Sequence, residues 1–184
     1  MLKFITGNKN KFKEVSVGLA PLRIEQLNID LLEIQELDRK KIIEHKIKEA
    51  FKHHKGEFLV EDASFYLQAF NYKFPGPFVK WFQQAVTNND IVALVNKTQK
   101  LGVKYVVVIG YAKSPSQIKF FEGVVEGSIV KKKGKGGFGF DPIVIPKGSK
   151  KTLAQMKEVG DYSLSARGKA LVKLKKYLKT RNQN

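Results

Sequence analysis

The start of the fold is decided by the stretch Lys3-Phe4-Ile5-Thr6-Gly7-Asn8-Lys9-Asn10-Lys11-Phe12. An apolar strand over residues 2–5 enters a Thr-Gly-Asn turn, and a helix predicted over residues 9–20 follows at once. Free backbone N–H groups and the positive end of the helix dipole make such a helix start favourable for an anion. The pattern therefore indicates a loop that can bind an anion, and the alternative is a solvated basic first turn.

Three lysines raise the positive charge at this helix start. Lys9 and Lys13 lie on one flank of the predicted helix, whereas Lys11 points elsewhere. The three side chains therefore cannot all contact one ligand.

Composition indicates an ordinary folded protein with an unusual charge. The chain has 184 residues, is 42% hydrophobic and contains no cysteine, so a single α/β domain over residues 1–184 is expected. No apolar run is long enough for a membrane span and no signal-peptide pattern is present, which predicts a cytoplasmic protein. The formal net charge of +17 favours polyanionic partners such as nucleotides or nucleic acid.

The order of predicted elements indicates a mixed sheet. Strands and helices alternate in the first third, in the βαβ pattern of a sheet with helical crossovers. Two later strands are joined by Ser114-Pro115-Ser116, which is short enough only for an antiparallel hairpin. The predicted elements are strand 2–5, helix 9–20, strand 22–29, helix 39–54, strand 57–61, a helix after the turn at 75–77, helix 88–98, strands 104–113 and 117–130, strand 143–145 and helix 163–179.

Two cations fall inside the apolar stripes of predicted helices. Lys46 projects between Ile42 and Ala50, so it either snorkels to the rim or reaches an anion in a cleft. Arg167 projects to the centre of the last helix's stripe and lies in its first turn, where the helix dipole opposes a cation. Arg167 therefore needs either a hydrogen-bonded ligand or a buried carboxylate.

Three acids are placed where a ligand site is expected. Glu61 and Asp62 follow the apolar run Phe58-Leu59-Val60, and strand alternation sends them to opposite faces of the sheet. If the second and third strands are neighbours, Glu33 and one of these two acids could share a Mg²⁺ ion, which needs only one or two carboxylates beside substrate phosphates. The alternative is that each acid caps a helix or pairs with a lysine.

One motif does not have the context that its pattern requires. Gly134-Lys135-Gly136-Gly137-Phe138-Gly139 satisfies G-x-G-x-x-G, but Asp141-Pro142 and a β-like run follow instead of a helix. A Rossmann site is therefore rejected. Phe138 and Phe140 beside Asp141 are better suited to a loop that stacks a ring and hydrogen-bonds its edge.

Five ordered segments together carry a family resemblance. They are Thr6-Gly7-Asn8-Lys9-Asn10-Lys11, Val60-Glu61-Asp62, Pro75-Gly76-Pro77-Phe78-Val79-Lys80-Trp81-Phe82, Gly137-Phe138-Gly139-Phe140-Asp141-Pro142 and Ser165-Ala166-Arg167-Gly168-Lys169-Ala170-Leu171. With these segments the chain resembles, nearly end to end, the inosine-triphosphate pyrophosphatase family, also called Ham1-like or non-canonical purine NTP pyrophosphatases.

The resemblance implies an elongated α/β fold, in which helices flank a long mixed β-sheet and two lobes enclose a central cleft. It also implies a homodimer that uses Mg²⁺ to hydrolyse ITP, dITP and XTP to the monophosphate and pyrophosphate. Glu33 and Asp62 would bind the metal, and Asp62 would also be the catalytic base. The implied substrate-binding residues are Thr6, Gly7, Asn8, Lys9, Asn10 and Lys11 for the triphosphate, with Lys46, Lys80, Phe138, Gly139, Phe140, Asp141, Ser165 and Arg167.

The resemblance implies that Ser165 to Arg167 correspond to the Ser-His-Arg segment with which the family recognises the base, and the chain departs from the family pattern there. The family usually has histidine at the position of Ala166 and lysine at that of Asp161, and the residue after Val-Glu-Asp is Ala63 rather than Thr or Ser. A site that loses hydrogen-bond donors discriminates less well between 6-keto and 6-amino purines. Lys157 is a candidate to replace the missing lysine.

Two rival functions remain open at this point. The net charge alone favours a basic nucleic-acid-binding module, although the chain lacks the aromatic-rich basic strand motif of RNA-binding sheets and any helix-turn-helix signature. The nearer rival is a pyrophosphatase for other modified nucleotides on a related fold. Neither specific nucleic-acid binding nor a membrane partner is expected.

Overall fold

The computed structural model describes residues 1–181, and the chain within it forms two compact units. Of the described residues, unit 1 comprises 1–62, 107–123 and 167–181, and unit 2 comprises 63–106 and 124–166. Across residues 1–181 the strands form a seven-stranded sheet with the path β2-β1-β3-β5-β6-β7, and β4 pairs with β3 beside that path. This sheet is mixed, as predicted. The chain passes between the units within three of its strands, and the expectation of one domain stays a prediction.

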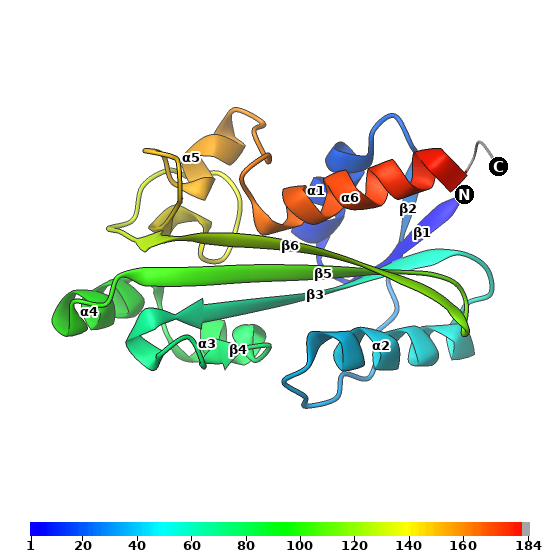
Figure 1. Cartoon of the computed structure of the whole chain (residues 1–184), viewed down its shortest axis with the longest axis horizontal. Coiled ribbons are helices and arrows are strands. Elements are labelled where there is room, and N and C mark those ends of the chain that lie inside the picture. Colours follow the sequence, from blue (N-terminus) through cyan, green and yellow to red (C-terminus); the bar gives the residue numbers. More distant parts are fainter. Residues whose placement is uncertain (182–184) are drawn as a thin grey trace. The chain divides into compact units, whose positions relative to one another are not determined.

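Unit 1 begins with a parallel βαβ arrangement (Figure 1). Strand β1 pairs in parallel with both β2 and β3, with Leu2 opposite Ile24 and Lys3 opposite Phe58. The elements with residues in this unit are β1 (Leu2–Ile5), α1 (Lys9–Leu19), β2 (Ile24–Leu27), α2 (Arg39–His53), β3 (Phe58–Leu67), β5 (Gly102–Ser114), β6 (Gln117–Ile129) and α6 (Ala166–Arg181).

Helices cover both faces of the sheet in unit 1 (Figure 1). On one face α1 packs against α6 so closely that a Cβ at Gly18 would meet Leu171 Cδ1 at 2.6 Å. On the other face α2 packs against β5, where a Cβ at Gly110 would meet Ile43 Cγ2 at 2.3 Å. The apolar stripe of each helix is thereby buried on the sheet.

Unit 2 is built around an aromatic core. Phe65 on β3 stacks on Phe140 with 4.0 Å between ring centroids, and Phe82 on α3 contacts Phe74 edge-on at 5.4 Å. The elements with residues in this unit, beside the remaining parts of β3, β5 and β6, are η1 (Gln68–Phe70), β4 (Pro75–Gly76), α3 (Val79–Ala85), α4 (Asn88–Thr98), η2 (Asp141–Ile143), β7 (Val144–Pro146) and α5 (Leu153–Glu158).

Local sequence signals explain where most helices begin. Asn8 and Asp38 cap α1 and α2, and their side chains accept hydrogen bonds from backbone N–H groups of the first turn. Helix α4 begins with a capping box between Thr87 and Asp90. A second capping box, Thr152-x-x-Gln155, starts α5, the short helix that the sequence analysis did not predict.

One prediction about the strands was wrong, and the condition set for a shared metal site was not met. The predicted strand 57–61 is the ten-residue β3, so Glu61 and Asp62 lie in mid-strand rather than after its end, because Ala-Ser-Phe-Tyr-Leu continues the strand to Leu67. Strand β1 lies between β2 and β3, so the second and third strands are not neighbours. Trp81 is also 59% exposed, whereas Phe82 is buried.

In the part of the chain that is described, no helix combines the length and the apolar character needed to cross a bilayer.

Candidate active site

In unit 1, Lys46 brings two of the predicted acids together. Its Nζ lies 2.8 Å from Glu33 Oε1 and 3.5 Å from Asp62 Oδ1, and it donates to the Glu61 carbonyl oxygen at 3.1 Å. Its side chain is only 8% exposed, so Lys46 reaches inward to anions and does not snorkel to the rim. The loop before α2 carries Glu33 to this point, although β1 separates β2 from β3.

Asp62 is the incompletely paired member of this group. Its side chain is 10% exposed, and its Oδ2 has no hydrogen-bond partner within residues 1–181. Burial raises the pKa of the Asp62 carboxyl, and the nearby charges of Lys46 and Lys11 offset only part of that effect. A buried carboxylate with a free oxygen and a raised pKa is suited to accept a proton.

Two carboxylates around one ammonium also suit a divalent ion beside a bound substrate. In the described residues no three His, Cys, Asp or Glu side chains gather as a complete metal site. Mg²⁺ does not need one, since it commonly binds one or two carboxylates together with substrate phosphates and water. Glu33, with a side chain 54% exposed, and the free Oδ2 of Asp62 fit this donor set.

Arg167 lies in a second buried charge cluster in unit 1. Its Nε and Nη2 donate to Glu61 Oε2 and Oε1 at 2.6 and 2.8 Å, and its Nη1 donates to Glu14 Oε2 at 2.6 Å. Lys11 Nζ approaches Glu61 Oε1 at 3.2 Å. These contacts correspond to the ion-pair alternative for Arg167, and they place Glu61 and Asp62 on opposite faces of β3 as strand alternation predicts.

The charge state of Glu61 follows from these neighbours. Burial by itself would raise the pKa of Glu61, but the charges of Arg167 and Lys11 and their hydrogen bonds outweigh burial and lower the pKa to about 2. Glu61 is therefore ionised at neutral pH and holds the two cations.

The predicted phosphate loop is accessible, but part of its helix start is already capped. Asn8 Oδ1 accepts the N–H groups of Asn10 and Lys11 at 2.9 and 3.1 Å, and the Asn8 N–H donates to Thr6 Oγ1 at 3.1 Å. Gly7, Asn8, Lys9 and Asn10 are exposed, whereas Thr6 and Lys11 are half-buried. Side chains and the remaining N–H groups are thus the groups that this loop offers to an anion.

Unit 2 holds a third buried pair, formed by Asp141 and Lys157. Lys157 Nζ lies 2.9 Å from Asp141 Oδ2 and 5.5 Å from the centroid of the Phe138 ring. Asp141 Oδ2 also accepts the Phe138 N–H at 2.7 Å. Gly137 makes this turn possible, because its φ is +71° and a Cβ there would lie 2.2 Å from Asp141 Oδ2. The structure thus brings Phe138, Asp141 and Lys157 together.

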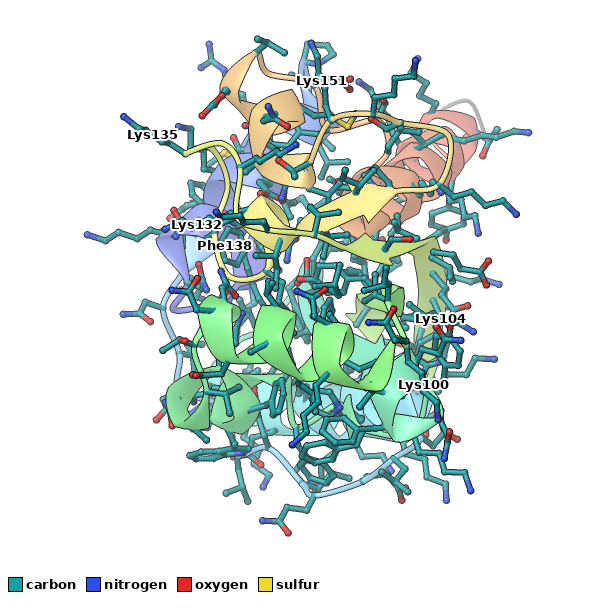
Figure 2. The ribbon with its side chains drawn as sticks, turned by 90° about the vertical axis from the view of Figure 1, so that its left-hand side faces the viewer. Lys100, Lys104, Lys132, Lys135, Phe138 and Lys151 are labelled. Carbon is teal, nitrogen blue, oxygen red and sulfur yellow. The ribbon has the colours of Figure 1, made fainter. Side chains whose placement is uncertain are left out.

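Other predicted site residues of unit 2 lie apart from that pair or in the core. Phe140 is buried against Phe65, whereas Phe138 is partly exposed (Figure 2). The Gly139 carbonyl oxygen accepts the side-chain amide of Asn88 at 3.0 Å. Lys80 is exposed, with its Nζ 5.4 Å from the centroid of the Trp81 ring.

The segment in which the chain departs from the family pattern combines an exposed turn with buried residues. Asp161 is exposed and accepts the Ser163 N–H at 2.9 Å, so it closes a turn. Ser165 is buried and donates to the Tyr162 carbonyl oxygen at 2.8 Å. Ala166, where the family usually has histidine, is 1% exposed.

Sequence reasoning missed Glu14. Its signal was available, because Glu14 falls beside Val15 in the buried stripe of α1 and three residues after Lys11. An acid in such a stripe needs a cation, and in the folded chain that cation is Arg167, 153 residues later.

Comparisons with known proteins agree with this architecture. The chain is 34% identical to a protein named inosine triphosphate pyrophosphatase from Candida albicans (strain WO-1), over 96% of the chain and 97% of the relative. It is 35% identical to a protein of the same name from Schizosaccharomyces pombe, over 96% and 94%. Its fold matches the Ham1 protein of Staphylococcus aureus with a TM-score of 0.78 at 23% identity, covering 98% of this chain and 100% of the other.

A second solved structure, a HAM1 protein from Coxiella burnetii, matches with a TM-score of 0.75 at 22% identity, over 98% of this chain and all of that one. The profile of the Ham1 family matches residues 2–177. On this near-complete match and the identity to its relatives, the chain belongs to the Ham1 family.

Proposed function

We propose that this protein hydrolyses non-canonical purine nucleoside triphosphates such as ITP, dITP and XTP to the monophosphate and pyrophosphate, with Mg²⁺ as cofactor. The observation that carries the proposal is the group formed by Lys46, Glu33 and Asp62, in which Asp62 Oδ2 has no hydrogen-bond partner within residues 1–181. Membership in a family whose relatives are named inosine triphosphate pyrophosphatases supports the substrate class.

For the triphosphate we propose the exposed loop at residues 6–11 and the two lysines that hold acids in unit 1. Lys11 Nζ lies beside the buried Glu61 carboxylate, and Lys46 Nζ lies beside the exposed Glu33 and the buried Asp62 carboxylates, so both ammonium groups are directed before substrate binds. Fixed cations stabilise negative charge on phosphate oxygens better than mobile ones, because they need no reorganisation during the reaction.

For the chemical step we propose Asp62 as general base. Its carboxylate would accept a proton from a water molecule while the water oxygen attacks the α-phosphorus. The α–β phosphoanhydride bond then breaks and pyrophosphate leaves. The raised pKa of Asp62 brings its basicity nearer to neutral pH than that of an ordinary aspartate. Mg²⁺ held by Glu33 and Asp62 would supply neutralisation of the phosphate charge.

For the base we propose Phe138, Asp141 and Lys157 of unit 2. Phe138 offers a partly exposed ring, and the Asp141–Lys157 pair places a donor and an acceptor beside it. Gly139 and Phe140 support this segment through a backbone hydrogen bond and the core, and we assign Ser165, which closes a turn at Tyr162, to base binding from the family pattern. Lys80 is an exposed cation of α3 that we assign to substrate binding from the family pattern alone.

The direct test is a panel of ITP, XTP, dITP, ATP and GTP with Mg²⁺, in which pyrophosphate and orthophosphate are measured separately. We expect pyrophosphate from ITP, dITP and XTP, with no orthophosphate and with lower kcat/KM for ATP and GTP. Orthophosphate as the first product would contradict the proposal, as would equal hydrolysis of all five. If none of the five is hydrolysed, a second panel of other modified nucleotides tests the nearer rival, and cleavage there would favour it.

The basic surface of unit 2 is the reason to test nucleic acid as well. Lys100, Lys104, Lys132, Lys135 and Lys151 lie on its strands and loops, and Lys135 projects outward (Figure 2). We expect duplex and single-stranded nucleic acid to bind only weakly, with an affinity that collapses on added salt through counterion release. Tight, salt-resistant binding to a defined sequence would favour the nucleic-acid-binding module instead.

We further propose a homodimer and a cytoplasmic location. The family pattern supports the first, and the second remains the expectation drawn from the sequence. Light scattering coupled to size-exclusion chromatography measures the mass of the particle, and a mass of about 21 kDa would contradict the dimer.

A further inference from the structure

We propose that Arg167 is a positioning residue for the triphosphate end of the site: it anchors Glu61, and Glu61 in turn aims Lys11. The inference rests on the proposed function only in assigning Lys11 to the triphosphate. The family pattern implies that Arg167 recognises the base, and this proposal gives Arg167 a different role.

The first step is the geometry at Arg167. Two of its nitrogens form a fork on the Glu61 carboxylate at 2.6 and 2.8 Å, and a third donates to Glu14 at 2.6 Å. All three side chains are at most 5% exposed. A planar guanidinium that is bound in this way on two sides fixes both the position and the rotation of Glu61.

The second step is the link from Glu61 to Lys11. Lys11 Nζ lies 3.2 Å from Oε1 of Glu61, the same oxygen that accepts from Arg167 Nη2. Glu61 is 1% exposed at its side chain, whereas Lys11 is 23% exposed. The buried end of the chain of contacts is therefore fixed, and its other end, the Lys11 ammonium, lies at the margin where a phosphate can reach it.

The third step is the charge balance. Arg167 and Lys11 carry two positive charges against the two negative charges of Glu14 and Glu61. Because Glu61 shares one oxygen between two cations, Lys11 is oriented without being neutralised. Without the Arg167 charge, two buried carboxylates would face Lys11 alone and would draw its ammonium away from a phosphate.

The experiment separates the two roles of Arg167 with a ligand that has no base. Inorganic tripolyphosphate is titrated by calorimetry into the wild type, Arg167→Gln, Lys11→Met, the double variant and the control Lys13→Met. Lys13 is an exposed lysine in the same helix start. We expect Arg167→Gln and Lys11→Met each to weaken tripolyphosphate binding about tenfold, and Lys13→Met to leave it unchanged.

The double variant tests whether Arg167 acts through Lys11. We expect it to bind tripolyphosphate within about threefold of Lys11→Met alone, because the arginine has no lysine left to position. Effects that multiply in the double variant would overturn the proposal and make Arg167 a general stabilising residue.

Kinetics with ITP and ATP test the alternative that Arg167 recognises the base. For Arg167→Gln we expect KM to rise for both nucleotides, while the ITP-to-ATP ratio of kcat/KM stays within about twofold. Unchanged tripolyphosphate binding with a collapsed ITP preference would instead make Arg167 a reader of the base. If Arg167→Gln does not fold, Arg167→Lys retains the charge but lacks the fork, and we expect it to weaken tripolyphosphate binding about threefold.

Failure of this inference differs from failure of the proposed function. If the wild type hydrolyses no nucleoside triphosphate, the proposed function is wrong, but the tripolyphosphate titrations still decide whether Arg167 acts through Lys11. If the wild type hydrolyses ITP and Arg167→Gln binds tripolyphosphate as tightly as the wild type, the positioning role alone is wrong.

Discussion

Lys46 and Arg167 are both buried cations that need a negative charge beside them, and the folded chain supplies that charge in two different ways. Both are cations inside the apolar stripe of a helix, and both end at carboxylates of unit 1. Arg167 is held by a fork and a third short hydrogen bond, in a cluster whose four charges balance. Lys46 has one close carboxylate and one at 3.5 Å, and its cluster carries one surplus negative charge.

This difference separates a buried cluster whose charges are paired within the chain from one that keeps an oxygen open to a ligand. A buried cluster whose charges balance and whose guanidinium nitrogens are paired needs no ligand to neutralise it. Removing one partner leaves an unpaired buried charge and strongly destabilises the folded state. Within residues 1–181 the Lys46 cluster has an Asp62 oxygen without a hydrogen-bond partner and an accessible Glu33 carboxylate, so it keeps groups that can bind the proposed Mg²⁺. The predictions below test this contrast, in order of decreasing effect.

The largest effect is expected at Asp62. Asp62→Asn removes the proposed base and one metal ligand, and we expect kcat for ITP to fall about a thousandfold, or about 4 kcal/mol. Turnover is measured by pyrophosphate release, and circular dichroism serves as the control for folding. Retention of more than about a tenth of the wild-type activity would remove Asp62 from the catalytic role.

The second effect is expected in the balanced cluster and concerns stability. Glu61→Gln leaves Arg167 without its fork, and we expect it to lower the free energy of unfolding by about 3 kcal/mol, or Tm by about 6–12 °C. Glu33→Gln is the matched control, because its side chain is 54% exposed, and its loss is expected to stay below about 1 kcal/mol. Equal losses in the two variants would break the contrast between the clusters.

The pH dependence of stability should have opposite signs at Glu61 and Asp62. The lowered pKa of Glu61 means that its contribution is present above its ordinary value of 4.5 and is lost as the pH falls toward about 2. The raised pKa of Asp62 means that the folded state prefers the protonated form, so its contribution declines as the pH rises above 3.8.

Thermal melts with a chelator present, taken from pH 3 to pH 8, measure these two contributions. Asp62→Asn mimics the neutral acid, so we expect its Tm to exceed that of the wild type at pH 7 and the gap to close toward pH 4. A gap of the opposite sign at pH 7 would show that Asp62 is stabilised as the anion in the metal-free protein.

The smallest effect concerns metal binding at Lys46. The Lys46 ammonium lies between the two proposed metal ligands, so Lys46→Gln should remove a charge that competes with Mg²⁺. Mg²⁺ binding is measured by the increase in Tm, and we expect the Mg²⁺ concentration at half of the maximal increase to fall about threefold. Lys48→Gln, an exposed lysine of the same helix, is the control. Weaker Mg²⁺ binding in Lys46→Gln would mean that Lys46 holds the acids in place for the ion.

Local pattern in the sequence was sufficient to identify the class of protein and the unusual charges. The Thr6-Gly7-Asn8 turn before a helix, the two cations in apolar stripes, and the alternation of Glu61 and Asp62 depend on residues close in the chain. Periodicities of 3.6 and 2.0 determine which faces these side chains take, so they can be read without a fold. The βαβ beginning, the hairpin at 114–116 and the mixed sheet followed from the same local signals.

Only the tertiary structure determined which charged side chains contact each other. The partners of Arg167 are 106 and 153 residues away, and Glu33 reaches Lys46 although β1 lies between β2 and β3. Such pairings depend on strand order and on how helices pack across a sheet, which hydrophobic periodicity does not encode. For the same reason the sequence could indicate that Arg167 needed an anion but not whether that anion is a ligand or Glu61.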